Sequence, residues 1–177
     1  SRGIQYISAV SNRVAWAVAF DGSGGNAKVK EYTMTTDGGA TWKAGSINPA
    51  NSAGFAASMI CAIDDKTAWV PLYDGTNGGG MIAKTTDGGK TWTQQTSATF
   101  TKPNGFPNVV HFWDADNGFC MGDPNGGYFE IYTTTNGGTN WTRVSQANIP
   151  APLNGEYGVV GYYDVIGDNV WFATNKG

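Results

Sequence analysis

One eight-residue string occurs three times in this chain and constrains its fold more than any other feature. It reads TTDGGATW at residues 35–42, TTDGGKTW at 85–92 and TTNGGTNW at 134–141, so its final tryptophans stand 50 and 49 residues apart. A second landmark keeps a similar period, with intervals of 53, 50 and 52 residues between Trp16, Trp69, Phe119 and Trp171. Self-similarity at this period indicates a stacked or radial repeat protein.

Each repeat divides into four short strands. In the second repeat they are SMICAI, KTAWVPLY, GMIAKTT and KTWTQQT, which are alternating or β-branched runs separated by Gly, Asp and Pro. Four antiparallel strands in about 50 residues are typical of one β-propeller blade. We therefore predict an all-β fold, a partial β-propeller of four-stranded antiparallel blades over residues 1–177. The blades are expected at about 4–48, 57–97, 108–148 and 158–177, the last of them incomplete.

About three and a half blades account for the whole sequence. A seven-bladed ring at about 50 residues a blade needs roughly 350 residues, about twice this chain. An unclosed piece of a propeller would leave open edges that invite pairing. We expect the remaining blades to come from a longer parent chain or from a second copy.

The repeated string has the residues of a tight turn closed by an aromatic ring. Its Asp can accept hydrogen bonds from N–H groups of its own turn, and its glycines supply backbone angles that a Cβ would forbid. Asn136 in the third copy keeps an acceptor oxygen but loses the charge, which a turn tolerates and a carboxylate site does not. We assign these positions a structural role and expect the tryptophans to be mostly buried: Thr35, Asp37, Gly39, Trp42, Thr85, Asp87, Gly89, Trp92, Thr134, Asn136, Gly138 and Trp141.

The three strings resemble the Asp-box, or BNR repeat, of sialidases, sortilin-type receptors, photosystem assembly factors and xyloglucan hydrolases. This resemblance implies a β-propeller with the box between the third and fourth strands of each blade. The stretches GDPNGGYFEIYTTTNGGTNW, IPAPLNGEYG and NVWFATNKG are more specifically similar to large secreted proteins of Bacteroidetes that carry a type IX secretion sorting domain. That likeness implies a bacterial protein that is secreted or held at the cell surface.

Composition argues against several partners. The net charge is −3 and the sequence contains no cluster of Lys and Arg that could bind a phosphate backbone, so we expect no nucleic acid as a partner. No apolar run approaches the roughly 20 residues of a membrane span. Cys61 and Cys120 lie in apolar strand contexts and are expected to be buried thiols, ahead of a disulfide or a metal site.

The loops that follow the second strand of each blade contain carboxylates in register. Asp21, Asp74 and Asp123 should lie on the face opposite the Asp-boxes, where they either begin Gly-rich turns or form a rim that binds a cation or a polyol. Phe55, Phe106 and Tyr157 come to the same face in the loops between blades, and they either stack on sugar rings or pack on one another. We expect no metal site and no cofactor, with calcium as the one candidate.

No set of residues forms a convincing catalytic centre, so we assign no catalytic residue. The only histidine, His111, shares a repeat position with Ser8 and Cys61, which favours a packing role. Glu31 and Glu130 share a third-strand position and are expected to be solvated. A sialidase would need three arginines that converge on the substrate carboxylate, and the only arginines, Arg2, Arg13 and Arg143, are not expected to meet at the mouth of the propeller.

Sequence alone therefore favours a non-enzymatic, secreted or cell-surface propeller that serves as a protein- or glycan-binding scaffold. The alternative is a glycoside hydrolase of the Asp-box propeller type. Such an enzyme needs two opposed carboxylates, which in this case would lie partly outside the sequence.

Overall fold

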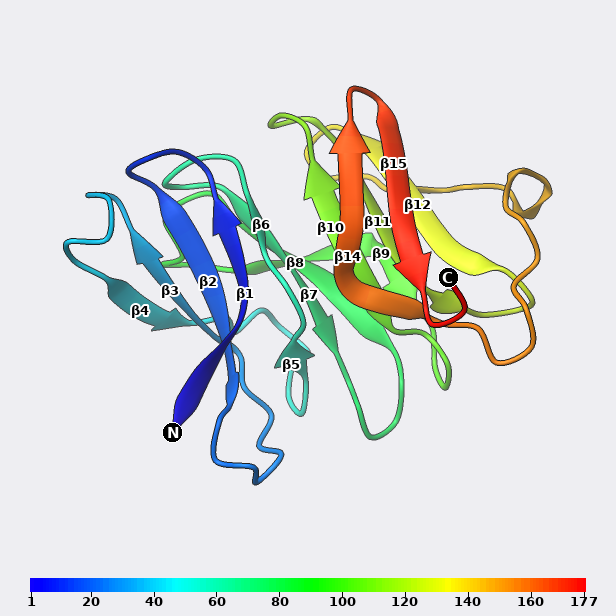
Figure 1. The fold of residues 1–177 in the computed structure, drawn as a ribbon, viewed down its shortest axis with the longest axis horizontal. Coiled ribbons are helices and arrows are strands. Elements are labelled where there is room, and N and C mark those ends of the chain that lie inside the picture. Colours follow the sequence, from blue (N-terminus) through cyan, green and yellow to red (C-terminus); the bar gives the residue numbers. More distant parts are fainter.

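The strands follow the sequence repeat in the computed structural model, which describes residues 1–177 (Figure 1). Three antiparallel sheets with four strand positions each, blades 1 to 3, stand side by side and are followed by a two-stranded sheet, blade 4. Within blades 1, 3 and 4 the strands pair in chain order. The fold is an all-β β-propeller of four-stranded antiparallel blades, as the repeat predicts.

The strands have the following bounds. Blade 1 contains β1 (Arg2–Ala9), β2 (Ala15–Asp21), β3 (Glu31–Thr35) and β4 (Lys43–Ser46). Blade 2 contains β5 (Ala56–Ala57), β6 (Cys61–Ala62), β7 (Ala68–Tyr73), β8 (Gly80–Thr85) and β9 (Thr93–Phe100). Blade 3 contains β10 (Pro107–Phe112), β11 (Asn117–Pro124), β12 (Phe129–Thr135) and β13 (Thr142–Arg143). Blade 4 contains β14 (Gly158–Ile166) and β15 (Asn169–Thr174).

The first strand of blade 2 is broken into two pieces. Both β5 and β6 pair with β7, and together they take the place that β1 and β10 have in their blades. Pro71 of β7 has no N–H to donate, and its carbonyl accepts the N–H of Ser58 between the two pieces at 3.1 Å. Register shifts also interrupt β1 and β10.

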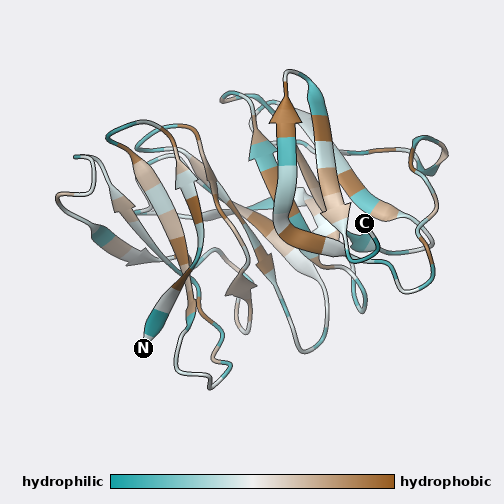
Figure 2. Cartoon of the chain, viewed as in Figure 1, coloured by the Kyte–Doolittle hydropathy of each residue, from teal (hydrophilic) through white to brown (hydrophobic).

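Apolar layers join neighbouring blades. Between blades 1 and 2 the rings of Tyr32 and Trp92 lie 5.8 Å apart, and in the layer shared by blades 2, 3 and 4 Trp69 stacks on Phe112 at 3.5 Å. Hydrophobic colour accordingly concentrates on the strands rather than on the loops (Figure 2). Both cysteines are buried and form no disulfide, as predicted, and burial raises the pKa of the Cys61 thiol to about 11.

The landmark tryptophans of the second strands hold each blade to the next. Trp16 and Trp69 are fully buried. Trp16 donates its indole N–H to the carbonyl of Asp64 in blade 2 at 2.9 Å, and Trp69 donates to the carbonyl of Gly137 in blade 3 at 3.2 Å. The same repeat position thus makes the same kind of contact with the following blade.

The repeated turns share one hydrogen-bond pattern. In the second turn the Asp87 carboxylate accepts the backbone N–H of Thr91 at 2.9 Å and the hydroxyls of Thr91 and Thr85 at 2.6 and 2.9 Å. The Thr85 hydroxyl accepts the N–H of Gly89 at 3.0 Å. The first turn repeats these bonds around Asp37. The polar side chains of the turn therefore satisfy its own backbone.

The third turn keeps the pattern with an amide in place of the carboxylate. The side-chain oxygen of Asn136 accepts the N–H of Asn140 at 2.9 Å. In all three turns the first glycine donates its N–H to a carbonyl of the turn between the first two strands of its own blade, at 2.8 to 3.0 Å. Gly88 and Gly89 have φ angles of 75° and 82°, a region that L side chains rarely adopt. Each box thus ties two turns of one blade together.

The expectation of burial is wrong for one of the three turn tryptophans. Trp92 and Trp141 are 7% and 6% exposed, whereas Trp42 is 48% exposed. Each buried tryptophan faces the preceding blade: the ring of Trp92 lies 5.8 Å from that of Tyr32, and the backbone N–H of Trp141 donates to the hydroxyl of Ser97. Trp42 belongs to blade 1, which has no preceding blade in this structure.

The only helical element is a three-residue 3-10 turn, Gln146–Asn148. It is far shorter than a membrane-crossing helix, and the structure contains no helix of that kind.

Candidate functional site

Loops from the two ends of the strands gather on opposite faces of the molecule. The repeated turns join third to fourth strands, whereas the loops after the second strands and the loops between blades leave from the other strand ends. We call the face formed by this second group of loops the mouth face. The predicted loop aspartates line two pockets on this face, and each of these pockets lies between neighbouring blades.

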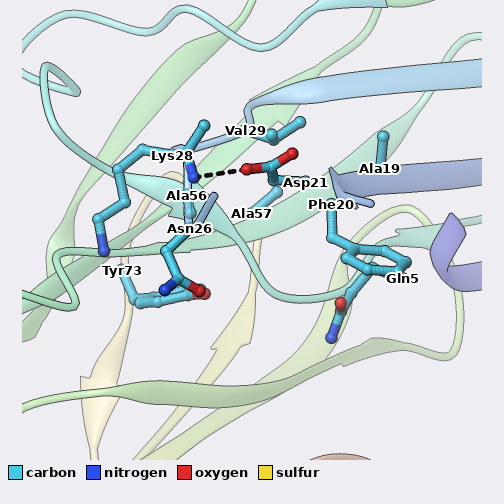
Figure 3. Close-up of a pocket in the computed structure, with 11 residues that line it drawn as sticks. Gln5, Ala19, Phe20, Asp21, Asn26, Lys28, Val29, Ala56, Ala57 and Tyr73 are labelled. Carbon is cyan, nitrogen blue, oxygen red and sulfur yellow. Dashed lines mark hydrogen bonds between the residues drawn. The ribbon is translucent and has the colours of Figure 1, made fainter. Parts of the chain in front are cut away.

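The first mouth pocket lies between blades 1 and 2 and has a volume of about 310 Å³. Figure 3 shows Asp21 near its centre, with Lys28 and Tyr73 on one side and Phe20 and Gln5 on the other. These residues come from β1, from the end of β2 and its following loop, and from the end of β7. The pocket therefore exists only when two blades are packed together.

The second mouth pocket lies between blades 2 and 3 and has a volume of about 370 Å³. Polar residues and glycines line most of it, from the loop that begins at Asp74, the loop 103–106, and Asp123. Phe106 is its one aromatic lining residue and packs against Tyr73 of the first pocket, with ring centroids 4.5 Å apart. The two pockets therefore adjoin at this aromatic pair.

Asp21 organises the loop after β2. Its carboxylate accepts the N–H groups of Ser23 at 3.0 Å and Ala27 at 2.8 Å, as well as the Ser23 hydroxyl. These bonds, led by the one from the Ser23 hydroxyl, lower the pKa of Asp21 to about 2. The carboxylate is ionised at neutral pH, and both of its oxygens already serve the loop.

Asp74 has the same role in the next blade. It accepts the backbone N–H groups of Thr76 at 3.0 Å and Asn77 at 3.1 Å, and its second oxygen accepts the Asn77 side-chain amide at 2.9 Å. Led by the Asn77 amide, these bonds lower the pKa of Asp74 to about 2. Lys102 lies 3.7 Å away across the loop. Asp74 is therefore engaged in the turn that it begins.

Asp123 differs from the other two aspartates. It lies within β11, and Asp21 is likewise the last residue of β2, which corrects the predicted placement of both residues in loops. One of its oxygens accepts the N–H of Gly158 in blade 4 at 2.9 Å, and burial raises its pKa. Asp123 therefore links blades 3 and 4 while it lines the second pocket.

The three aspartates do not come together as one ring. Asp21 lines the first pocket, and Asp74 and Asp123 line the second. No group of three or more His, Cys, Asp or Glu side chains gathers anywhere in the structure in a way that suits a metal ion.

The three candidate aromatics have different environments. Phe106 lines the second pocket, Tyr157 is 52% exposed outside both pockets, and Phe55 packs against the apolar layer between blades 1 and 2. Only Phe106 is placed to contact a ligand in a mouth pocket.

The two third-strand glutamates also have different environments. Glu31 is partly exposed and pairs with Arg2 at 2.8 Å, but Glu130 is fully buried, so the expectation that both are solvated is wrong for Glu130. Arg143 lies 3.6 Å from Glu130 and over the ring of Tyr128. Burial raises the pKa of Glu130. The third-strand position that Glu31 and Glu130 share does not predict this ion pair, because Arg143 lies in the fourth strand of the blade, β13.

His111 occupies the packing position that the repeat predicts. It lies opposite the second-strand landmark of its blade, as Ser8 and Cys61 do in theirs. Its Nδ1 is 3.1 Å from the hydroxyl of Tyr163 in blade 4, and burial lowers its pKa. His111 therefore joins two blades and lines neither mouth pocket.

Several lining residues were missed by sequence analysis, among them Lys28, Tyr73, Asn77 and Asn104. Tyr73 has the repeat position of Phe20, four residues after the landmark tryptophan, whereas the repeat did not single out the other three. Each pocket combines residues from two blades, which one repeat does not contain. The sequence indicated these residues only by their positions beside the loop aspartates or in the loops between blades.

No family model and no curated protein sequence matches the chain. Solved structures similar to it include YCF48 bound to D1 peptide, with a TM-score of 0.57 and 21% identity over 90% of this chain and 49% of that one. A GH74 enzyme of Niastella koreensis matches with a TM-score of 0.52 and 20% identity over 80% of this chain and 22% of the enzyme. The GH74 xyloglucanase of Xanthomonas campestris matches with a TM-score of 0.55 and 13% identity over 81% and 22%.

The chain spans about half the length of the YCF48 chain and under a quarter of each GH74 enzyme. At these identities the likeness establishes the β-propeller fold and nothing finer.

Proposed function

We propose that the chain is a non-enzymatic β-propeller module that binds a protein or glycan ligand at its mouth face. The observation that carries the proposal is the pair of adjoining pockets between blades 1, 2 and 3, joined through Tyr73 and Phe106. Concave sites with a few convergent polar groups and an aromatic wall are typical of ligand recognition.

The chemistry of the second pocket favours an uncharged, polar ligand. The side chains of Thr76, Asn77 and Asn104 offer amides and a hydroxyl, and Phe106 offers an aromatic surface. Peptide backbones and sugar hydroxyls both pair with such groups. Asp74 holds its loop from within, and a pre-formed loop loses less entropy on binding. The peptide complex of YCF48 supports the proposal, since it is a protein of similar fold with a peptide bound.

Chemical-shift mapping on the ¹⁵N-labelled chain tests this proposal. Xyloglucan oligosaccharides and short unstructured peptides are titrated separately, and we expect one class to shift the amides of residues 75–78 and 104–106. Asn104→Ala should weaken that binding. Asn140→Ala, an equally exposed change at the Asp-box end, should not. Shifts confined to the Asp-box turns would contradict the proposal.

A glycoside hydrolase remains the second candidate, because two carboxylates with opposite pKa shifts line one pocket. The turn lowers the pKa of Asp74 to about 2, while burial raises that of Asp123. Carboxylates tuned in opposite directions suit base and acid roles, and the GH74 enzymes have a similar fold. Release of reducing sugar from xyloglucan, abolished by Asp123→Asn, would favour this candidate over a binding module.

We further propose that the protein is bacterial and is secreted or displayed at the cell surface. The support is the likeness of its repeats to secreted Asp-box propellers. Protease treatment of intact cells should remove the protein if it is displayed, and retention inside intact cells would contradict this location.

A further inference from the structure

A buried ion pair in blade 3 is connected by hydrogen bonds to a loop that lines the second mouth pocket. Glu130 of β12 is fully buried and lies 3.6 Å from Arg143 of β13. Its carboxylate accepts the hydroxyl of Thr101 at 3.4 Å. The side-chain amide of Asn125 donates to both the hydroxyl and the carbonyl of Thr101. Thr101 directly follows β9 and begins the loop 101–106.

The loop 101–106 forms one wall of the second mouth pocket. Its lining residues are Pro103, Asn104, Gly105 and Phe106. The carbonyl of Thr101 accepts the N–H of Gly105 at 2.7 Å, and the carbonyl of Gly105 accepts the N–H of Gly79 in blade 2 at 2.7 Å. At the other end of the loop, the carbonyl of Phe106 accepts the N–H of Asp123 at 2.9 Å. The shape of this wall therefore depends on where Thr101 is held.

A blade packs without a buried carboxylate at the position of Glu130. In blade 2 the same position, four residues before the first threonine of the repeated turn, is Met81, which is 4% exposed in the apolar layer. In blade 1 it is Glu31, which is partly exposed. The position of Arg143 is Gln94 in blade 2. The repeat thus accepts an uncharged pair at these two places, and only blade 3 buries an ion pair there.

Packing of the blade does not explain this ion pair. One oxygen of Glu130, Oε2, and two nitrogens of Arg143, Nε and Nη2, are buried without a hydrogen-bond partner within the chain. A buried ion pair with unpaired atoms stabilises a protein less than well-packed apolar side chains do. Burial also raises the pKa of Glu130. The contact of its other oxygen with Thr101 is the feature that Met81 cannot reproduce.

We propose that Glu130 is a positioning residue of the second mouth pocket, whose carboxylate holds the loop 101–106 in its binding conformation through the Thr101 hydroxyl. This inference rests on the proposed binding of a ligand at the mouth face. Glu130 does not line the pocket, so it acts on the loop and not on the ligand. A loop that is held before the ligand arrives loses less entropy on binding.

Two double variants of the whole chain test this role. Both carry Arg143→Gln, so that no unpaired arginine is left buried, and they differ only in Glu130→Gln or Glu130→Met. Glutamine keeps an oxygen that can accept the Thr101 hydroxyl, whereas methionine removes it. Thr101→Val removes the hydroxyl from the other side of the same contact. Glu31→Met is the control, since it changes the same repeat position in blade 1.

Amide exchange and urea unfolding are measured first, without a ligand. Exchange of the Gly105 and Gly79 amides should be about tenfold faster with Glu130→Met than with Glu130→Gln, because the loop opens more often. Thr101→Val should accelerate the same amides. The Glu130→Met double variant should be at least as stable as the Glu130→Gln one, which a purely structural role of Glu130 does not predict.

Affinity is then measured for the peptide or oligosaccharide that shift mapping identifies. The Glu130→Met double variant and Thr101→Val should bind it roughly tenfold more weakly than the Glu130→Gln double variant, and Glu31→Met should bind like the wild type. Equal affinities of the two double variants, or wild-type affinity of Thr101→Val, would overturn the positioning role. A wild-type chain that binds neither ligand class would instead refute the proposed function, and the exchange rates would then still show whether Glu130 holds the loop.

Discussion

Replacing Trp92 by Ala should destabilise the chain far more than the same change at Trp42, although both residues close the same repeated turn. Trp92 is 7% exposed and lies in the apolar layer between blades 1 and 2, against Tyr32. Trp42 is 48% exposed on the side of blade 1 that no other blade covers. The pair therefore isolates the effect of the neighbouring blade from the chemistry of the turn.

The expected magnitudes follow from these exposures. Burial of a tryptophan side chain removes roughly 150–250 Å² from water, which at about 25 cal/mol per Å² is about 4–6 kcal/mol as an upper bound. Loss of Trp92 should cost about 3–5 kcal/mol, since it also leaves a cavity. Trp42 already has about half of its surface in water, so its loss should cost about 1–2 kcal/mol. The indole N–H of Trp92 has no partner, so the change breaks no side-chain hydrogen bond.

Urea unfolding followed by far-ultraviolet circular dichroism measures the difference. Both changes are made in the wild-type background and are measured at the same protein concentration. We expect the free energies of unfolding of the two variants to differ by at least about 2 kcal/mol. Equal losses at unchanged m-values would refute the view that the neighbouring blade, rather than the turn, holds the tryptophan.

Two further predictions concern titration and metal binding. Burial lowers the pKa of His111 in the folded protein, so the neutral ring is favoured and the free energy of unfolding should fall as the pH drops below about 6.5, the ordinary histidine pKa. His111→Gln should reduce that loss in urea titrations between pH 7.5 and 5. An unchanged pH profile would contradict the buried, neutral state of His111. Calcium titration by calorimetry should give equal, negligible heats for the wild type and for a variant in which Asp21, Asp74 and Asp123 are all replaced by Asn. A saturable heat in the wild type that is lost in the variant would show a cation site at these residues.

The features that sequence analysis predicted are those that one repeat determines locally. The spacing of Trp16 and Trp69 predicts the length of a blade, and Asp37 and Asp87 form hydrogen bonds within their own turns. Both features can therefore be predicted from the sequence without knowledge of tertiary contacts. The register of His111 with its counterparts in the other blades follows from the same period.

The errors all depend on contacts between blades or between strands. Trp42 is exposed because no preceding blade covers it, and Glu130 is buried beside an arginine from another strand. Asp123 is engaged by an N–H of blade 4, far along the chain. The mouth pockets were missed for the same reason, since each is made by two blades and no single repeat contains one.

The most direct test of the account compares binding between the two ends of the blades. Asn104→Ala in the second mouth pocket and Asp87→Ala in the second repeated turn are measured for stability and for affinity toward the peptide or oligosaccharide identified by shift mapping. Asn104→Ala should weaken binding at unchanged stability, and Asp87→Ala should lower stability, because its turn loses an acceptor, while folded protein binds normally. Loss of binding by Asp87→Ala at full stability would place the site at the repeated turns and contradict the account.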